Sequence, residues 1–558
     1  MDKGSKFCIA FATILILAAG LRLYSLDERF YNWDEGLHVW YVQSFLETGA
    51  HKYDPVYHGP FPVFFTAPFL ALGGFSEVTF RLVPAIFGIA LVGLALYLRM
   101  IWSDKGEITA IVAAFFLAVS PFFLWFSRFY RNDIHAVFFS LFAFISLMLY
   151  FRTKRDRWLF GAFAALSLGF ADMENTLITI FIFATFLLIW HFLPQIRARK
   201  LNLSAPVIVL KSAMLLAVVL TFSHAALMSN LHPAAKLLCF SIVLMLSARM
   251  AYRHFSKPVA SLFAAGVIAI WIYATLFSSF FALQTPIYEP VVKAITTWTS
   301  RGIAGPPHYY LFRMALYELP VLAFGIAGIA YYLRRRKRSF ETAFLIYWFA
   351  AALAIYSLFV GEKQPQVTMH MLLPLLVIAS LFISDVFAQK NFPGRKIIAV
   401  ALIPLMLFYL YTTFGLNYVR FNDVREPMEY VQIPQDVRGL MQEVVSRLES
   451  GERIAFLEGK SINYGTQPFY IFMRHYKSNV SSLLTDEQLA IADPEAIKNL
   501  TADIANNYST ENWRVWYYYP HEARMAENLA NWRFWLFREI NESHISEQHK
   551  FVVLRRIG

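Results

Sequence analysis

Two adjacent carboxylates, Asp34 and Glu35, lie in the sequence Tyr-Asn-Trp-Asp-Glu-Gly, shortly after the first apolar run of the chain. A carboxylate whose pKa is raised by partial burial can take a proton from a hydroxyl group while that hydroxyl attacks another centre. The same side chains could instead cap the helix expected to follow, because acidic groups near a helix N-terminus bind its free backbone N–H groups. Both roles are open, and one residue could serve each.

Cationic side chains that could hold a phosphate occur at two further places. Residues 127–133 read Ser-Arg-Phe-Tyr-Arg-Asn-Asp, with Arg128 and Arg131, and Lys363 lies in Gly-Glu-Lys-Gln-Pro. Guanidinium groups bind phosphate oxygens in pairs and stay charged when partly desolvated. Interfacial arginines also extend to lipid headgroups, and Lys363 could lie in a solvated turn. Asp133, one residue into an apolar run, could pair with an arginine or be a second carboxylate of the site.

These polar residues stand out because the rest of the chain is strongly apolar. Of its 558 residues, 58% are hydrophobic and 16% charged, and the mean hydropathy is +0.47, which excludes an ordinary soluble protein. The first apolar run is expected to be a retained span, because no small-residue cleavage site follows it. Apolar runs long enough to cross a bilayer predict about 13 transmembrane helices, near 7–25, 78–101, 107–126, 134–151, 158–172, 176–193, 205–223, 233–250, 260–283, 312–333, 341–360, 367–387 and 397–416.

Positive charge is unevenly spread along the chain. Residues 1–416 carry 34 Lys and Arg against 19 Asp and Glu, whereas residues 417–558 carry 16 against 19. A basic excess in short loops between spans orients a membrane protein, so it does not indicate nucleic-acid binding. If the N-terminus is cytoplasmic, the most basic loops all fall inside and the acidic pair falls outside. We therefore predict a multi-pass protein of the cell membrane with a cytoplasmic N-terminus and an extracytoplasmic active face.

The chain is expected to divide into two domains at about residue 416. Residues 1–416 form the membrane domain, whose first external loop, 26–77, contains an amphipathic helix over 36–48 and an apolar stretch over 60–72 that is too short to span. Residues 417–558 are predicted to form an extracytoplasmic α/β domain, with helices over 435–448 and 522–539 and strands over 453–457 and 551–554. Cys8 and Cys239 both lie in apolar runs, which excludes a disulfide framework or a thiolate metal site.

The order of the motifs resembles the GT-C superfamily of membrane glycosyltransferases. The acidic pair, His-Gly-Pro at 58–60, Ser-Arg-x-x-x-x-Asp at 127–133 and Glu174-Asn175 look like the branch with protein O-mannosyltransferases and lipid A aminoarabinose transferases. Later motifs resemble a narrower, largely archaeal family of flippase-activity-associated proteins, at 305–311, 317–320, 361–365 and 425–432. The chain departs from that family at Pro307 and Gln366, where the family tends to have tryptophan.

The resemblance implies an all-α polytopic fold of GT-C type and an inverting transfer of one sugar from a polyprenyl-phosphate donor, dolichyl- or undecaprenyl-phosphate. The acceptor would be a glycan, lipid or protein outside the cytoplasm. No cofactor is required, although a divalent metal is possible. The family label also leaves open a non-enzymatic transport or assembly factor for lipid-linked glycans. The roles implied are Asp34 as base with Glu35 as second catalytic carboxylate, Arg128, Arg131 and Lys363 as holders of the donor phosphate, and His58, Asp133 and Glu174 as supporting or acceptor-binding groups.

Overall fold

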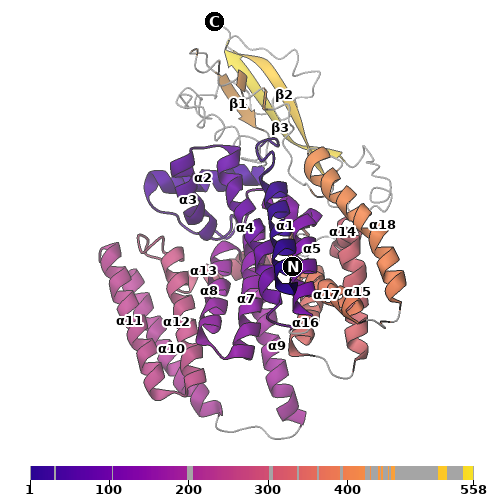
Figure 1. The fold of residues 1–558 in the computed structure, drawn as a ribbon. Helices are drawn as coiled ribbons and strands as arrows, with labels where there is room; N and C mark the ends of the chain where they lie inside the picture. Colours follow the sequence, from indigo (N-terminus) through magenta and orange to yellow (C-terminus); the bar gives the residue numbers. More distant parts are fainter. Residues whose placement is uncertain are drawn as a thin grey trace.

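A computed structural model shows a long helical bundle with a small sheet beyond one end (Figure 1). It describes residues 2–30, 33–102, 105–197, 205–300, 306–335, 339–360, 363–389, 392 and 394–421, several residues between 426 and 450, and three strands after residue 453. The described part of residues 1–416 is helical apart from its connecting loops, which confirms the predicted all-α membrane fold.

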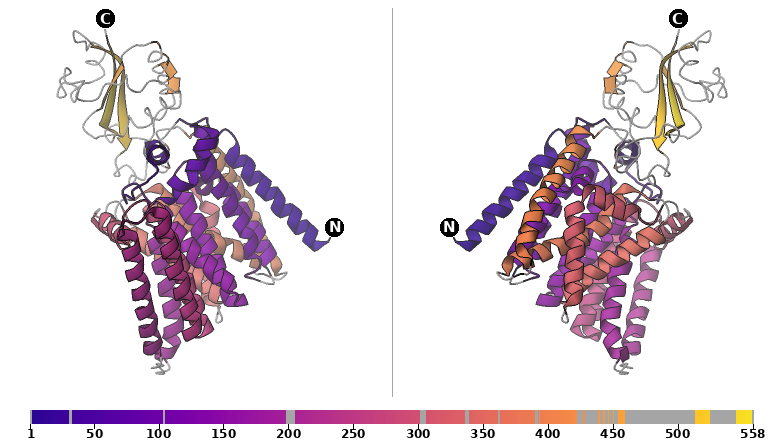
Figure 2. Two further views of the ribbon diagram at one scale, coloured as in Figure 1. Left: turned by 90° about the vertical axis from the view of Figure 1, so that its left-hand side faces the viewer. Right: turned by 90° about the vertical axis from the view of Figure 1, so that its right-hand side faces the viewer.

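The acidic pair lies on a helix that crosses one end of the bundle. Helix α1 (Lys3–Leu23) begins at Asp2, whose carboxylate accepts the Ser5 N–H at 2.7 Å, and it slants away from the bundle towards the N-terminus (Figure 2). Helices α2 (Trp33–Thr48) and α3 (Phe61–Gly73) follow in the first loop. Because α2 begins before Gly36, Asp34 and Glu35 belong to its first turn rather than preceding it.

The bundle itself contains helices of very different burial. The central helix is α17, in which 89% of an apolar stretch of 18 residues is buried. The same fraction for α18, at the edge of the bundle, is 17%. Helix α17 packs on α15, α16, α5 and α7. The helices after α3 are α4 (Glu77–Leu98), α5 (Gly106–Val119), α6 (Pro121–Ser127), α7 (Asp133–Thr153), α8 (Asp156–Asp172), α9 (Thr176–Arg197), α10 (Ala205–Met228), α11 (Pro233–His254), α12 (Lys257–Phe277), α13 (Glu289–Ser300), α14 (Tyr309–Tyr317), α15 (Leu319–Arg334), α16 (Phe340–Leu358), η1 (Pro365–Val367), α17 (Thr368–Ala388), α18 (Arg395–Phe414) and η2 (Gly415–Val419).

Each predicted span coincides with a helix or with a bent pair of helices. Within the described residues, eight helices are long and apolar enough to cross a membrane, or ten if each of two bent pairs is one span. The three other predicted spans coincide with α8, which has 17 residues, and with the shorter apolar stretches Thr176–Phe192 and Met214–Met228. The total of 13 therefore stays a prediction.

Both bent pairs meet at one buried carboxylate. Helices α5 and α6 bend by 60° at Ser120, and α14 and α15 bend by 116° at Glu318. The Glu318 carboxylate accepts the Ser120 hydroxyl at 2.5 Å, the Phe122 N–H at 3.1 Å and the Tyr409 hydroxyl. Since α6 leads directly into residues 128–133, this contact sets the direction in which that loop leaves the bundle.

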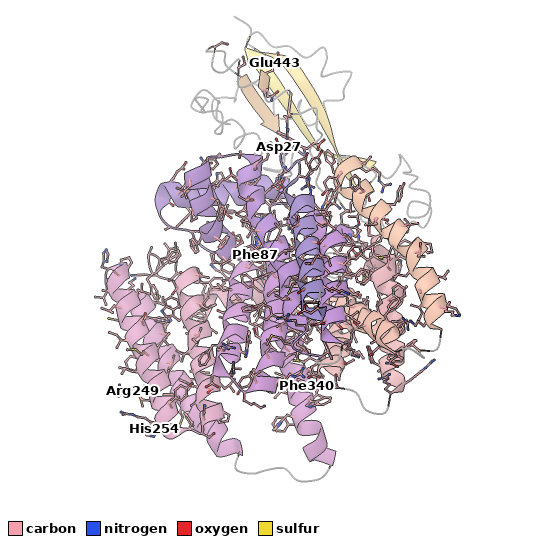
Figure 3. All side chains as sticks on the ribbon, in the orientation of Figure 1. Asp27, Phe87, Arg249, His254, Phe340 and Glu443 are labelled. Atoms are coloured by element: carbon pink, nitrogen blue, oxygen red, sulfur yellow. The ribbon has the colours of Figure 1, made fainter. Side chains whose placement is uncertain are left out.

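The two ends of the bundle differ in the residues they carry. Asp27 lies at the end where α2 crosses, whereas Arg249, His254 and Phe340 lie near the opposite end (Figure 3). This separation agrees with the predicted division between an acidic-pair side and a basic-loop side. Which side faces the cytoplasm remains a prediction from the charge pattern.

Three strands follow the bundle and form an antiparallel sheet in the order β1-β3-β2, with bounds β1 (Ile454–Glu458), β2 (Trp513–Arg524) and β3 (Ile545–Arg556). Strand β1 overlaps the strand predicted at 453–457, β3 contains the one predicted at 551–554, and Phe456 pairs with Val553. Strand β2 was not predicted. The expected helix over 522–539 is wrong at its start, because residues 522–524 belong to β2, and its remainder lies outside the described residues. So does most of the helix expected over 435–448, and the α/β domain stays a prediction.

Candidate active site

The centre of the candidate site is an ion pair between Asp34 and Arg131. Asp34 comes from the first turn of α2 and Arg131 from the loop between α6 and α7, 97 residues later, and the guanidinium donates to the Asp34 carboxylate. The two residues are 7% and 5% exposed. The first loop and residues 127–133 therefore meet in the structure, where a carboxylate and a fixed cation lie in direct contact.

Arg131 has further partners on other elements. Its Nε lies 3.0 Å from Oδ2 of Asp133, which begins α7. With the Gln366 amide oriented so that its oxygen faces the guanidinium, that oxygen accepts from Nη2 at 2.8 Å and from Nη1 at 3.1 Å. Gln366 is one of the two residues at which the chain departs from the family pattern, so this departure lies against the central arginine.

Glu35 is held by a different arginine. Its carboxylate accepts hydrogen bonds from Arg81 of α4, from Nε at 2.8 Å and from Nη2 at 2.6 Å, and from the Tyr130 N–H at 2.8 Å. Burial by itself would raise the pKa of Glu35, but Arg81 and the Tyr130 N–H together lower that pKa below its usual value. Glu35 thus anchors α2 to α4 and to the loop that carries Arg131, which favours a supporting role over that of a second base.

His58 and Glu174 form a second pair beside the first. His58 Nδ1 lies 2.8 Å from Glu174 Oε2, and the other carboxylate oxygen accepts the Tyr53 hydroxyl at 2.8 Å. The His58 backbone has a φ of +70°, a conformation that non-glycine residues adopt only where the surroundings impose it. Gly59 shows how tight this turn is, because a Cβ there would lie 2.0 Å from the Ala171 carbonyl oxygen.

A layer of backbone contacts ties the first loop to residues 128–133. The Asp172 carbonyl accepts both the Gly59 N–H at 3.1 Å and the Asn132 side-chain amide at 2.5 Å. The Asp172 carboxylate lies 3.1 Å from Nδ1 of His135. The end of α8 is therefore the point at which the two segments that carry the site are held together.

Two predicted phosphate holders are engaged elsewhere. Arg128 donates to the carbonyls of Leu21 at 3.0 Å and Ser25 at 3.0 Å, and so closes the C-terminal end of α1. Lys363 donates to the carbonyls of Tyr356, Ser357 and Val360 at 2.6, 3.0 and 2.9 Å, at the end of α16. Of the three cations expected to face a phosphate, Arg131 alone contacts Asp34 in the structure.

The sequence reasoning missed several residues that contact the predicted ones. Arg81 was detectable, because an arginine within an apolar span is costly unless it has a buried partner. His38 could be inferred from its position one helical turn after Asp34. Tyr53 and Trp298 carried no such signal, since their contacts depend on how distant elements pack. Gln366 stood out only as a departure from the family pattern, which did not predict its contact with Arg131.

The described side chains do not fit a resident metal ion. Within the residues that the structure describes, no group of three or more His, Cys, Asp or Glu side chains is arranged to hold one. Asp34 and Glu35 each face a guanidinium, which competes with a cation for the same oxygens. The side chains at Asp34 and Glu35 can therefore act without a metal ion.

Comparison with solved structures identifies the fold. The crystal structure of ArnT from Cupriavidus metallidurans in the apo state is similar over 99% of this chain and 98% of that chain, with 14% sequence identity and a TM-score of 0.51. The chain has the GT-C fold. The model of the dolichyl-phosphate-mannose-protein mannosyltransferase family matches residues 57–225, which include His58, Arg131 and Glu174. A search of the curated proteins found no match.

Two other GT-C structures show weaker similarity. The Archaeoglobus fulgidus oligosaccharyltransferase in the apo form is 16% identical, with a TM-score of 0.49 and coverage of 85% of this chain and 60% of that chain. The S. cerevisiae protein O-mannosyltransferase Pmt1-Pmt2 complex bound to the sugar donor is 21% identical, with a TM-score of 0.31 and coverage of 46% and 34%. This GT-C chain spans 56 to 60% of the length of the oligosaccharyltransferase chains that it matches.

Proposed function

We propose that this GT-C protein is an inverting glycosyltransferase that moves a sugar from a polyprenyl-phosphate donor to an acceptor outside the cytoplasm. The observation that carries the proposal is the buried contact between Asp34 and Arg131. It joins a proton acceptor and a fixed cation, the two groups that such a transfer needs, within a fold that it shares with ArnT. ArnT has also been crystallised bound to undecaprenyl phosphate.

The reaction assigns one task to each member of the pair. An acceptor hydroxyl loses its proton to the Asp34 carboxylate while its oxygen forms a bond to the anomeric carbon of the donor sugar. The bond from that carbon to the phosphate oxygen breaks on the opposite face, so the configuration inverts. The phosphate leaves with an additional negative charge, which Arg131 stabilises because its charge is fixed in a desolvated place.

Asp133 and Gln366 prepare Arg131 for this task. When the phosphate arrives, Arg131 can turn part of its guanidinium towards it without losing all of its partners, because Nε stays near Asp133. Glu35 and Arg81 hold the start of α2 in place from the other side. The groups around the reaction are thus positioned by four separate elements, α2, α4, α7 and η1.

The contacts at the broken helices argue against a transport or assembly factor. Such a protein should expose polar groups to both sides in turn, often at breaks near the middle of the membrane. The break residue Glu318 is fully buried and accepts hydrogen bonds from Ser120, Phe122 and Tyr409. Its carboxylate joins the bent helices to each other and to α18, as expected for a structural contact.

Asp34→Asn tests the proposal, because asparagine keeps the shape and can still accept from Arg131 but cannot take the proton. We expect sugar transfer from a polyprenyl-phosphate donor to fall by about 10²- to 10⁴-fold. Asp54→Asn is the matched control: Asp54 is exposed in the same loop, and asparagine can replace its contact with the Val56 N–H. Equal transfer rates in the Asp34→Asn variant and the parent protein would refute Asp34 as the base.

A further inference from the structure

We propose that His58 and Glu174 form a proton exit route, which takes the proton from Asp34 after each transfer and delivers it to a cavity beside Tyr53. This inference rests on the proposed function, since it concerns the proton that the acceptor hydroxyl loses. Asp34 is 7% exposed, so it has little direct contact with bulk water. A buried base must lose the proton that it has accepted before it can act in the next turnover.

The route begins on α2. Asp34 and His38 are four residues apart, so they project from the same face of the helix, about 5–6 Å apart at Cβ. The His38 ring stacks on the His58 ring, with 6.2 Å between the centroids. Asp34 and His58 are therefore the two ends of one short row of side chains.

His38 does not itself store the proton. Burial lowers the pKa of His38 well below its usual value, and the nearby His58 and Arg131 lower it further. His38 is neutral at rest and passes the proton on, from Asp34 to the first histidine along the row that has a carboxylate partner. That histidine is His58.

The His58–Glu174 pair has the geometry of a proton acceptor. Glu174 Oε2 lies 2.8 Å from Nδ1, which orients the ring and stabilises an imidazolium while Nε2 takes a proton. The indole of Trp298, from α13, also stacks on the His58 ring, with 5.7 Å between the centroids and 1° between the planes.

The route ends in a cavity. The second oxygen of Glu174 accepts the Tyr53 hydroxyl at 2.8 Å, and Tyr53 lines a cavity of about 210 Å³ together with Lys52, Gln284 and Glu289. Liquid water occupies about 30 Å³ per molecule, so several waters fit there. Lys52 and Glu289 give the cavity polar walls.

The proton balance closes over one cycle. The Asp34 carboxyl O–H bond breaks and the proton crosses the His38 ring, which takes it at one nitrogen and releases one from the other, so that an N–H bond forms at His58 Nε2. This restores the Asp34 carboxylate and the neutral His38 ring and creates the His58 imidazolium. The imidazolium then loses one proton, through Glu174, to water in the cavity. One acceptor hydroxyl proton has left the protein, and no group has been oxidised or reduced.

The test separates the first turnover from later ones. His58→Asn removes the proton acceptor but suits a backbone with positive φ, since asparagine tolerates that region better than most residues. With enzyme in excess over donor, the single-turnover rate should stay within about twofold of the parent, whereas multiple turnover should slow by about tenfold or more. Imidazole in the buffer should restore multiple turnover, because a small base can reach the cavity and replace the missing ring.

Two variants complete the experiment. Glu174→Gln should show the same separation, with weaker rescue because His58 remains. His232→Asn is the matched control: His232 caps α11 on an exposed loop, and asparagine is itself a good cap, so all rates should match the parent.

Each result decides for or against the route. A transfer rate that falls only under multiple-turnover conditions, and that imidazole restores in His58→Asn, supports the route. An equal fall in the single-turnover rate, a raised donor KM without rescue, or unchanged multiple turnover in both site variants would overturn it. If His58→Asn fails to fold, the Glu174→Gln rates decide alone. Transfer that survives Asp34→Asn refutes the proposed function instead, so the two failures are distinguishable.

Discussion

Replacing Glu35 should lower the stability of the folded protein rather than remove a catalytic group. In Glu35→Ala, the Arg81 guanidinium loses two hydrogen bonds, at 2.8 and 2.6 Å, and the Tyr130 N–H loses a third at 2.8 Å. Both partners of the ion pair are essentially inaccessible, with side-chain exposures of 1% for Arg81 and 0% for Glu35. Removing one partner of such a pair leaves a buried charge and costs about 3–5 kcal/mol.

Replacing Arg81 as well tests whether this loss of stability comes from its uncompensated charge. In the double variant Glu35→Ala/Arg81→Met the buried charge is gone as well, so we expect part of the lost stability to return. Asp34→Asn should cost less than about 1 kcal/mol, since Arg131 keeps Asp133 at 3.0 Å. The two neighbouring carboxylates should therefore differ by several-fold in their effect on unfolding.

Titration with a denaturing detergent in mixed micelles measures the free energy of unfolding of parent and variants. The effect should also depend on pH. Because Arg81 lowers the folded-state pKa of Glu35, its stabilisation is fully present above the unfolded value of about 4.3 and is lost as the pH falls through the lower folded value. If Glu35→Ala unfolds like the parent and loses only transfer activity, Glu35 is catalytic and our interpretation of its contacts is wrong.

Three further outcomes are expected. Gly59→Ala should destabilise the protein by about 1–3 kcal/mol, because its Cβ would meet the Ala171 carbonyl, whereas Gly20→Ala, with nothing within 4 Å, should be neutral or stabilising; equal thermal melting of the two variants would contradict this. Lys363→Met should lower the melting temperature by removing three hydrogen bonds to the end of α16, with little change in donor KM; a large rise in KM at parent-like stability would restore Lys363 as a phosphate holder. Burial lowers the pKa of His51 to about 4, so the neutral folded form loses stability relative to the unfolded chain as the pH falls from about 6.5 towards 4; His51→Phe should show a shallower loss in unfolding measurements over that range.

The different contacts of Arg128 and Arg131 could not be predicted from the sequence. Arg128 and Arg131 were equivalent candidates, three residues apart at the same predicted interface. In the structure Arg128 follows α6 and closes the end of α1, while Arg131 turns to Asp34. The difference depends on the bend at Ser120 and on contacts between residues about 100 positions apart, which no local pattern encodes.

The sequence by itself determined the helices, the two unlike ends of the bundle and the acidic pair, because apolar length and loop charge act locally along the chain. The tertiary structure alone decided which cation each carboxylate meets, brought Gln366 to Arg131 and joined His58 to Glu174. Those choices follow from the packing of α2, α4, α7 and η1 around residues 128–133. Asp34 becomes a candidate base, and Glu35 an anchor, only through the neighbours that this packing supplies.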